Sequence, residues 1–128
     1  MIVIDASALV RAATLSTTES KLFDRIADEL HGPHLIDFEV TQALRGMLLS
    51  GKISAVTAVQ ARAAVAALTV HRYPFSSLAD RVWELRDNLT AYDASYVALA
   101  EALGGPLVTC DAKLHGAPDI RATIELYT

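Results

Sequence analysis

Two short apolar runs that each lead into an aspartate most constrain the fold of this chain. Residues 2–4 precede Asp5, and residues 107–109 reach Asp111 through Cys110. Runs that are apolar on both faces are typical of parallel strands buried between two helical layers. The carboxyl ends of such strands form one edge of the sheet, where ligands bind. The two runs therefore predict a parallel sheet with carboxylates at its ligand-binding edge.

Other segments alternate between strand and helix patterns. Residues 123–127 predict a C-terminal strand, and residues 34–35 and 70–73 are weaker strand candidates. Strands separated by helices favour an α/β domain with three layers, in which helices cover both faces of a central, mostly parallel sheet. We expect one domain, residues 1–128. Apolar spacing predicts helices over 19–30, 36–50, 54–68, 78–89 and 91–103, with caps at Ser54, at Ser76 or Ser77, and at Thr90.

Composition excludes several classes of protein. Hydrophobic residues make up 52% of the chain and charged residues 20%, which excludes a disordered chain. The single cysteine, Cys110, excludes an internal disulfide and a zinc site with several cysteines. The chain opens without a basic signal region, and its longest apolar run, 63–68, is far shorter than the roughly 20 residues of a membrane span. We therefore expect a cytoplasmic protein that does not contact a membrane.

The charge and the histidines limit what the chain can bind. Eleven Lys and Arg stand against fifteen Asp and Glu, so the net charge of −4 argues against passive nucleic-acid binding. Basic residues are in excess over residues 41–90, which fits either a surface that guides phosphates or ordinary solvated helices. The four histidines show no spacing typical of metal ligands, and we expect them on the surface: His31, His34, His71 and His115.

Several carboxylates are candidates for a common site, each with a simpler alternative. Asp5 and Asp111 could serve only as helix caps. Asp93 falls on the inward arc of its helix, where an unpaired carboxylate costs several kcal/mol, although the first helical turn favours negative charge. Asp37 and Glu39 flank the apolar stripe of helix 36–50 at similar angles. Periodicity leaves open which of these two faces a central site.

Three or four converging carboxylates would repel one another unless a cation joined them. Mg²⁺ prefers oxygen ligands, and a pair of such ions can activate water and stabilise the leaving oxygen in phosphodiester cleavage. Glycoside hydrolysis needs only two carboxyl groups. The acidic set therefore favours metal-dependent phosphodiester hydrolysis.

The residues around these acids resemble PIN-domain proteins, specifically the VapC toxins of bacterial toxin–antitoxin pairs. Four blocks carry the resemblance in order along the chain: MIVIDASALV at 1–10, LIDFEVTQALR at 35–45, LRDNLTAYDASYVALA at 85–100 and LVTCDAKL at 107–114. The four acids of the family fall on Asp5, Glu39, Asp93 and Asp111. The resemblance thus selects Glu39 over Asp37.

The resemblance implies an endoribonuclease toxin that depends on Mg²⁺ or Mn²⁺. Asp5 and Asp93 would be the principal metal ligands, and Glu39 and Asp111 would complete the site directly or through water. It further implies that Ser7 and Thr109 support these ligands through polar contacts. The site that the resemblance predicts therefore consists of these four carboxylates and the two hydroxyl groups that support them.

The partners implied by the resemblance are an RNA substrate, a VapB-type antitoxin that inhibits the toxin, and a second copy of the chain. The apolar helices 19–30 and 54–68 are candidate partner surfaces, although ordinary core packing explains either one alone. The four site carboxylates carry a charge of −4, which is the net charge of the whole chain, so the rest of the protein is neutral. RNA could therefore approach it, particularly near Arg45, Arg72, Arg81 or Arg86.

Two other functions remain open at this point. One is a PIN-like module that binds without catalysis. The other is a Mg²⁺-binding phosphoacceptor domain of the receiver type. A receiver needs a central aspartate and a late lysine at strand ends, whereas Lys113 follows Asp111 by only two residues.

Overall fold

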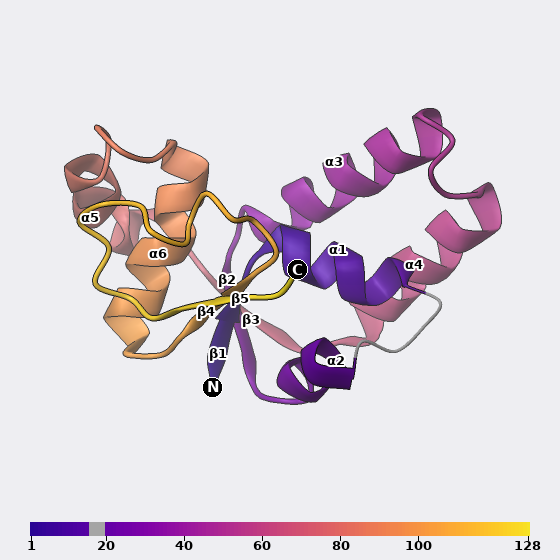
Figure 1. Ribbon diagram of the computed structural model, residues 1–128, viewed down its shortest axis with the longest axis horizontal. Coiled ribbons are helices and arrows are strands. Elements are labelled where there is room, and N and C mark those ends of the chain that lie inside the picture. Colours follow the sequence, from indigo (N-terminus) through magenta and orange to yellow (C-terminus); the bar gives the residue numbers. More distant parts are fainter. Residues whose placement is uncertain (16–19) are drawn as a thin grey trace.

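A parallel sheet runs through the centre of the protein, with helices on both sides (Figure 1). The computed structural model describes residues 1–15 and 20–128. In these ranges the sheet has five strands in the order β3-β2-β1-β4-β5, and each neighbouring pair runs parallel. The strands are β1 (Ile2–Ile4), β2 (Leu30–Pro33), β3 (Val70–Tyr73), β4 (Leu107–Thr109) and β5 (Ile124–Leu126).

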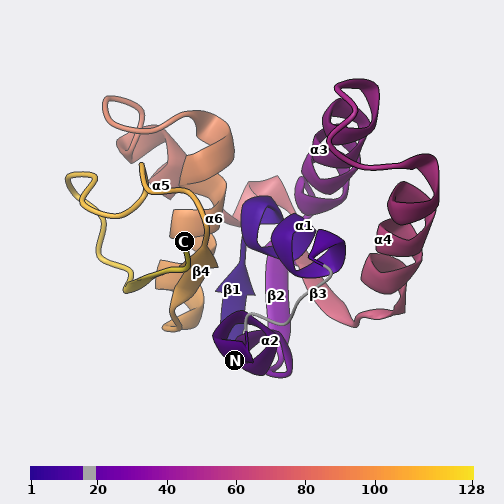
Figure 2. The same cartoon turned by 45° about the vertical axis from the view of Figure 1, so that its right-hand side comes forward.

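Helices form the two outer layers, which confirms the predicted three-layer α/β class. Helix α6 contacts β1, β2 and β4 on one side of the sheet, and α1 lies on the opposite side, next to α3 and α4 (Figures 1 and 2). The helices are α1 (Ala6–Thr14), α2 (Ser20–Ile26), α3 (Ile36–Leu49), α4 (Ala55–Ala67), the 3₁₀ turn η1 (Phe75–Ser77), α5 (Ala79–Glu84) and α6 (Ala91–Leu103).

The caps of two helices form as predicted. The Ser54 side chain accepts a hydrogen bond from the Thr57 amide at the start of α4, and Thr90 accepts one from the Asp93 amide at the start of α6. Helix α6 ends at Gly104, whose φ of 70° is a left-handed conformation that glycine adopts without steric cost. The sequence therefore sets both ends of the helix that carries Asp93.

The second strand does not lie where the sequence predicted it. Strand β2 occupies Leu30–Pro33, and His34 and Leu35 follow it. The helical spacing of the preceding segment suggested a helix up to residue 30, but Leu30 pairs with residues of both neighbouring strands. Gly32 permits close packing here, because a Cβ atom at this position would lie 3.2 Å from Cδ1 of Ile36. Tertiary pairing therefore overrides the local pattern.

Two predicted helices are shorter than expected. Helix α2 ends at Ile26, and the predicted start at Glu19 lies outside the described residues. Helix α5 ends at Glu84 and is followed by turns, so the prediction of one helix through residue 89 was wrong. The predicted serine cap was also wrong, because Ser77 Oγ donates to the Pro74 carbonyl in η1 and no side chain caps α5.

The strand order locates the ligand-binding edge of the sheet. From β1 the chain proceeds to β2 and β3 on one side, and then crosses over to β4 and β5 on the other. The order thus reverses between β1 and β4, which is the position where open α/β sheets bind ligands. It differs from the 2-1-3-4-5 order of receiver-type domains. The receiver alternative is therefore wrong.

The core lies along both faces of β1 and the inner side of α6. Ile2, Val3 and Ile4 are fully buried, and every residue of α6 from 94 to 100 is buried as well. Helix α6 is enclosed because the sheet lies on one side while α5 and the segment after β4 lie on the others (Figure 1). No helix within the described part of the chain is long and apolar enough to cross a membrane.

Candidate functional site

Asp5 lies at the carboxyl end of β1 and is almost completely buried, with 6% of its surface exposed. Its Oδ1 accepts hydrogen bonds from the Ala8 amide at 3.0 Å and from Ser7 Oγ at 2.6 Å, while Thr109 Oγ1 donates to its Oδ2. Asp5 is thus the N-cap of α1, as the simpler alternative required. The two hydroxyls also hold its carboxylate in one orientation at the ligand-binding edge.

Asp111 reaches the same edge from the neighbouring strand. Its amide donates to Thr109 Oγ1 at 2.9 Å, so one threonine hydroxyl connects the segments of both aspartates. Its Oδ1 accepts from the Lys113 amide at 3.0 Å within a turn. Turns follow Asp111 in the structure, so this residue closes a turn instead of capping a helix, and the simpler alternative is wrong for it.

Asp93 and Glu39 come from helices on different parts of the sheet. Asp93 is half-buried in the first turn of α6, where the helix dipole favours its charge. Glu39 is half-buried on α3, and its Oε1 accepts a hydrogen bond of 2.6 Å from the hydroxyl of Tyr96. Tyr96 lies one turn after Asp93 and is 2% exposed. This bond links the two acid-bearing helices.

The electrostatic interactions of these four acids identify them as one charged group. Burial raises the pKa of Asp5 against the opposing effect of its hydrogen bonds, and the charge of Asp111 raises it further. Burial also raises the pKa of Asp93, reinforced by Asp111 and Asp5. The pKa of Glu39 is raised by burial and by the charges of Asp93 and Asp5, although the Tyr96 bond lowers it. Each carboxylate therefore interacts with at least one other.

Asp37 has a different environment from Glu39. It lies on the exposed side of α3 and accepts two hydrogen bonds from Arg72 of β3, at 2.6 and 2.8 Å. The Arg72 guanidinium holds the pKa of Asp37 below its usual value. The charges of Asp93 and Asp5 act on Glu39, whereas Arg72 is the main charged partner of Asp37, so Glu39 is the acid of this pair that lies near the other carboxylates.

Two residues near the site were not singled out by the sequence. Tyr96 is buried, and its spacing of three residues from Asp93 places both on one side of α6. Lys113 follows Asp111 by two residues. Its charge lowers the pKa of Asp93, partly offsetting the other effects, so it is a cation near the carboxylates.

The donor set fits a hard divalent cation. It consists of carboxylate oxygens that repel one another, and hydroxyl groups already hold one of these carboxylates in place. Oxygen donors of this kind bind Mg²⁺ or Mn²⁺ in preference to softer ions. A cation at this position would also remove the repulsion that raises the pKa values.

The histidines only partly follow the prediction of surface positions. His34, His71 and His115 are exposed, but His31 is buried, with 6% of its surface accessible. Its ring nitrogens contact the Tyr73 hydroxyl and the Glu29 carboxylate, both at the same sheet face. These partners compensate the free-energy cost of burying the imidazole. Sequence spacing alone does not reveal Tyr73 as a partner, because it is 42 residues away from His31.

Comparisons with known proteins agree over nearly the whole chain. The family model of the PIN domain matches residues 2–119. Ribonuclease VapC9 of Mycobacterium tuberculosis is 46% identical over 114 residues, covering 89% of this chain and 88% of the relative. Ribonuclease VapC1 of the same species is 42% identical over 127 residues, covering 97% and 96%. The crystal structure of PAE2754 from Pyrobaculum aerophilum superimposes with a TM-score of 0.70 at 27% identity, covering 96% of this chain and 81% of the other.

The raised pKa of Asp5 predicts how the stability of the metal-free protein depends on pH. Above about pH 4, where an unfolded aspartate has lost its proton, the native state binds more protons than the unfolded state. The contribution of Asp5 to the free energy of unfolding therefore falls as the pH rises. Asp5→Asn removes this loss and keeps a side-chain oxygen for the N-cap. Urea unfolding in EDTA measures the free energy of unfolding of both proteins without metal. At pH 7 this free energy should be at least as large for the variant as for the wild type, and the difference between the two should be smaller near pH 4.

Asp37→Asn is the matched control, because the pKa of Asp37 is lowered and its contribution has the opposite sign. The deficit of this variant relative to the wild type should develop below about pH 4, as the pH rises from the lowered pKa of native Asp37 to that of unfolded aspartate, and stay constant at higher pH. For an exposed ion pair it should reach at most ~1 kcal/mol. If Asp5→Asn instead followed the pattern of Asp37→Asn, the hydrogen bonds of Asp5 would outweigh the repulsion, and the shared acidic site would be wrong.

Proposed function

Because the chain belongs to the PIN-domain family, and within it to the VapC ribonucleases, we propose that it is the toxin of a toxin–antitoxin pair and cleaves RNA as a metal-dependent endoribonuclease. The observation that carries this proposal is the mutual charge interaction of Asp5, Glu39, Asp93 and Asp111 where the strand order reverses. We place the whole chain, residues 1–128, in a single PIN domain that acts on RNA in the cytoplasm.

The four carboxylates would hold Mg²⁺ or Mn²⁺. When bound, the metal lowers the pKa of a water molecule and neutralises charge that develops on the phosphate. The protein contributes the orientation of its ligands: Ser7 and Thr109 fix the Asp5 carboxylate, and Tyr96 fixes Glu39. Burial raises the pKa of Tyr96, so its hydroxyl keeps its proton and continues to donate to Glu39.

The basic side chains of the protein differ in their availability for RNA. Arg72 is bound to Asp37, and Arg81 to Glu101 at 2.7 Å. These ion pairs reduce the charge that either arginine offers to a phosphate. Lys113 lies close enough to Asp93 to lower its pKa. We therefore assign the first phosphate contact beside the carboxylates to Lys113.

Replacement of Asp93 by asparagine should abolish the activity. Asp93→Asn keeps the shape of the side chain but removes a charge from the metal ligands. RNA cleavage in Mg²⁺ should therefore fall at least ~100-fold, which is the loss typical when an enzyme loses one hydrogen-bond donor to a transition-state oxyanion. Expression of the wild type without its antitoxin should arrest bacterial growth, and the variant should not. Asp37→Asn should cleave RNA like the wild type, because Asp37 is bound to Arg72 outside the site.

Full cleavage by a well-folded Asp93→Asn protein would contradict the assignment of the site. Absence of metal-dependent cleavage by the wild type over a range of RNA substrates would favour the alternative, a PIN-like module that binds without catalysis.

An apolar groove between α1, α2 and α4 is our candidate for the antitoxin. Its cavity measures about 190 Å³. Parts of both helices predicted as partner surfaces line it, and an amphipathic antitoxin helix could bury its apolar face there. The lining residues are Leu9, Ala12, Ala13, Phe23, Ile26, Ala64, Val65 and Leu68.

A charge placed in this groove should weaken antitoxin binding. Ala64 lines the groove and is exposed, so Ala64→Glu should leave the fold intact while burying an unpaired carboxylate in the complex. We expect the affinity for the VapB-type antitoxin, measured by titration calorimetry, to fall at least ~10-fold. The matched control is Ala63→Glu, which adds the same charge at an exposed neighbour outside the groove lining. Equal affinities for both variants would place the antitoxin elsewhere.

We further propose that the protein forms a homodimer. Large apolar side chains are exposed on α3, α5 and α6, and association with a second copy would remove such surface from water. Phe38 and Leu49 of α3 are 78% and 68% exposed, and Trp83 of α5 and Tyr92 of α6 are 68% and 62% exposed. Light scattering at micromolar concentration should give twice the chain mass of 13.7 kDa. A monomer over this concentration range would contradict the dimer.

A further inference from the structure

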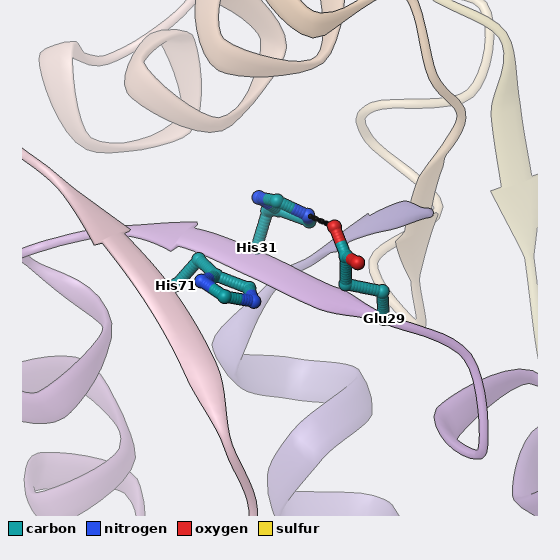
Figure 3. Close-up of side chains that lie close together, drawn as sticks. All are labelled: Glu29, His31 and His71. Atoms are coloured by element: carbon teal, nitrogen blue, oxygen red, sulfur yellow. Dashed lines mark hydrogen bonds and ion pairs between the residues drawn. The ribbon is translucent and has the colours of Figure 1, made fainter.

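A second group of metal-binding side chains lies on the sheet outside the acidic site. Glu29 immediately precedes β2, His31 lies within β2, and His71 lies on the edge strand β3. His31 and His71 are direct neighbours in the strand register, so their side chains leave the same face (Figure 3). Residue 29 shares this face with residue 31 because side chains alternate along an extended segment.

The three side chains offer ligand atoms at close range. One nitrogen of each histidine and one carboxylate oxygen of Glu29 all lie within 4.8 Å of one another. His31 Nε2 and Glu29 Oε1 are 2.6 Å apart, and the two imidazole rings stack with centroids 4.8 Å apart. A bound ion at ordinary bond lengths of about 2.0–2.2 Å to each ligand would require the exposed side chains of Glu29 and His71 to rotate around the buried His31 ring.

His31 is held in the way that metal-binding histidines commonly are. Its Nδ1 lies 2.7 Å from the hydroxyl of Tyr73, which leaves Nε2 directed at Glu29. A hydrogen bond to the second ring nitrogen fixes the tautomer and the ring orientation of a ligand histidine. The burial of His31 restricts the ring further, while Glu29 and His71 are exposed and give an ion access from solvent.

We propose that Glu29, His31 and His71 bind a divalent transition-metal ion of the Zn²⁺ type, at a site separate from the four carboxylates. Imidazole nitrogen suits Zn²⁺, Co²⁺ and Ni²⁺, whereas Mg²⁺ is bound by oxygen ligands. Three protein ligands leave a fourth position of a tetrahedral ion to water. The two donor sets of this protein therefore select different metals.

The position of the group separates it from the acidic site. Within the sheet, His31 is paired with Val3, and Leu30 with Ile2, so the group lies toward the amino ends of the strands. Asp5 follows the carboxyl end of β1. Because its ligands come from β2, the segment before it and the edge strand β3, the ion would join this edge strand to the interior of the sheet.

Zinc titration of the wild-type protein, purified without a histidine tag and with millimolar Mg²⁺ to occupy the carboxylates, tests the proposal. We expect one Zn²⁺ per chain by calorimetry, and Co²⁺ should give visible absorption bands of a site with nitrogen ligands. His71→Ala and Glu29→Gln should each weaken Zn²⁺ binding at least ~10-fold, because even supporting residues contribute this much to affinity. Both residues are exposed, so the variants should fold.

Three controls make the result decisive. His34→Ala and His115→Ala remove exposed histidines outside the group and should bind Zn²⁺ like the wild type. Asp93→Asn should also retain Zn²⁺ binding. The proposal is overturned if the wild type binds no Zn²⁺ in the presence of Mg²⁺, if His71→Ala binds as tightly as the wild type, or if Asp93→Asn rather than His71→Ala loses the ion.

Discussion

Repulsion among the carboxylates at the reversal of strand order is the constraint around which the surrounding structure is arranged. Asp5 and Asp111 are delivered to one edge because β1 and β4 are parallel neighbours. Burial and the charges of neighbouring carboxylates both raise the pKa values of Asp5, Glu39 and Asp93. Nearby groups reduce the cost of keeping such charges in the fold: hydroxyls and an amide donate to Asp5, and the first turn of α6 stabilises Asp93.

Helix α6, which carries Asp93, is buried over most of its length. Its residues from 94 to 100 pack against the sheet, α5 and the segment after β4. A helix held on several sides cannot rotate to bring Asp93 to solvent. Its start is fixed by the Thr90 cap, and Tyr96 connects it to α3 through Glu39. The packing of apolar residues around α6 thus determines the positions of Asp93 and of Tyr96, the hydrogen-bond partner of Glu39.

The sequence was sufficient for features that depend on local chemistry. The β-branched run of residues 2–4 indicated a buried strand, and Ser54 and Thr90 indicated helix starts, all of which the structure confirms. Positions that depend on distant partners were not accessible. Helical spacing alone could not separate Asp37 from Glu39, because the difference comes from Arg72, which is 35 residues away.

Strand β2 and the histidines show the same limit. The helical pattern before Leu30 was misleading because the strand is defined by pairing with β1 and β3. The burial of His31 depends on Tyr73, also on another strand. For the catalytic roles of the four acids, the resemblance of the sequence remains the source of the prediction, and the geometry adds that these acids share one electrostatic environment.

Stability and metal binding oppose each other at this site. In the metal-free protein each ionised carboxylate raises the cost of ionising the next, which lowers the stability of the fold above the pKa of unfolded aspartate. A divalent cation bound here would remove that cost, so the repulsion would add to the favourable free energy of binding. Replacing an acid by a neutral residue would therefore stabilise the empty fold and weaken its affinity for metal. Charged oxygens held close together by the strands and by α6 would give a hard cation a tight site, at the expense of the stability of the metal-free fold.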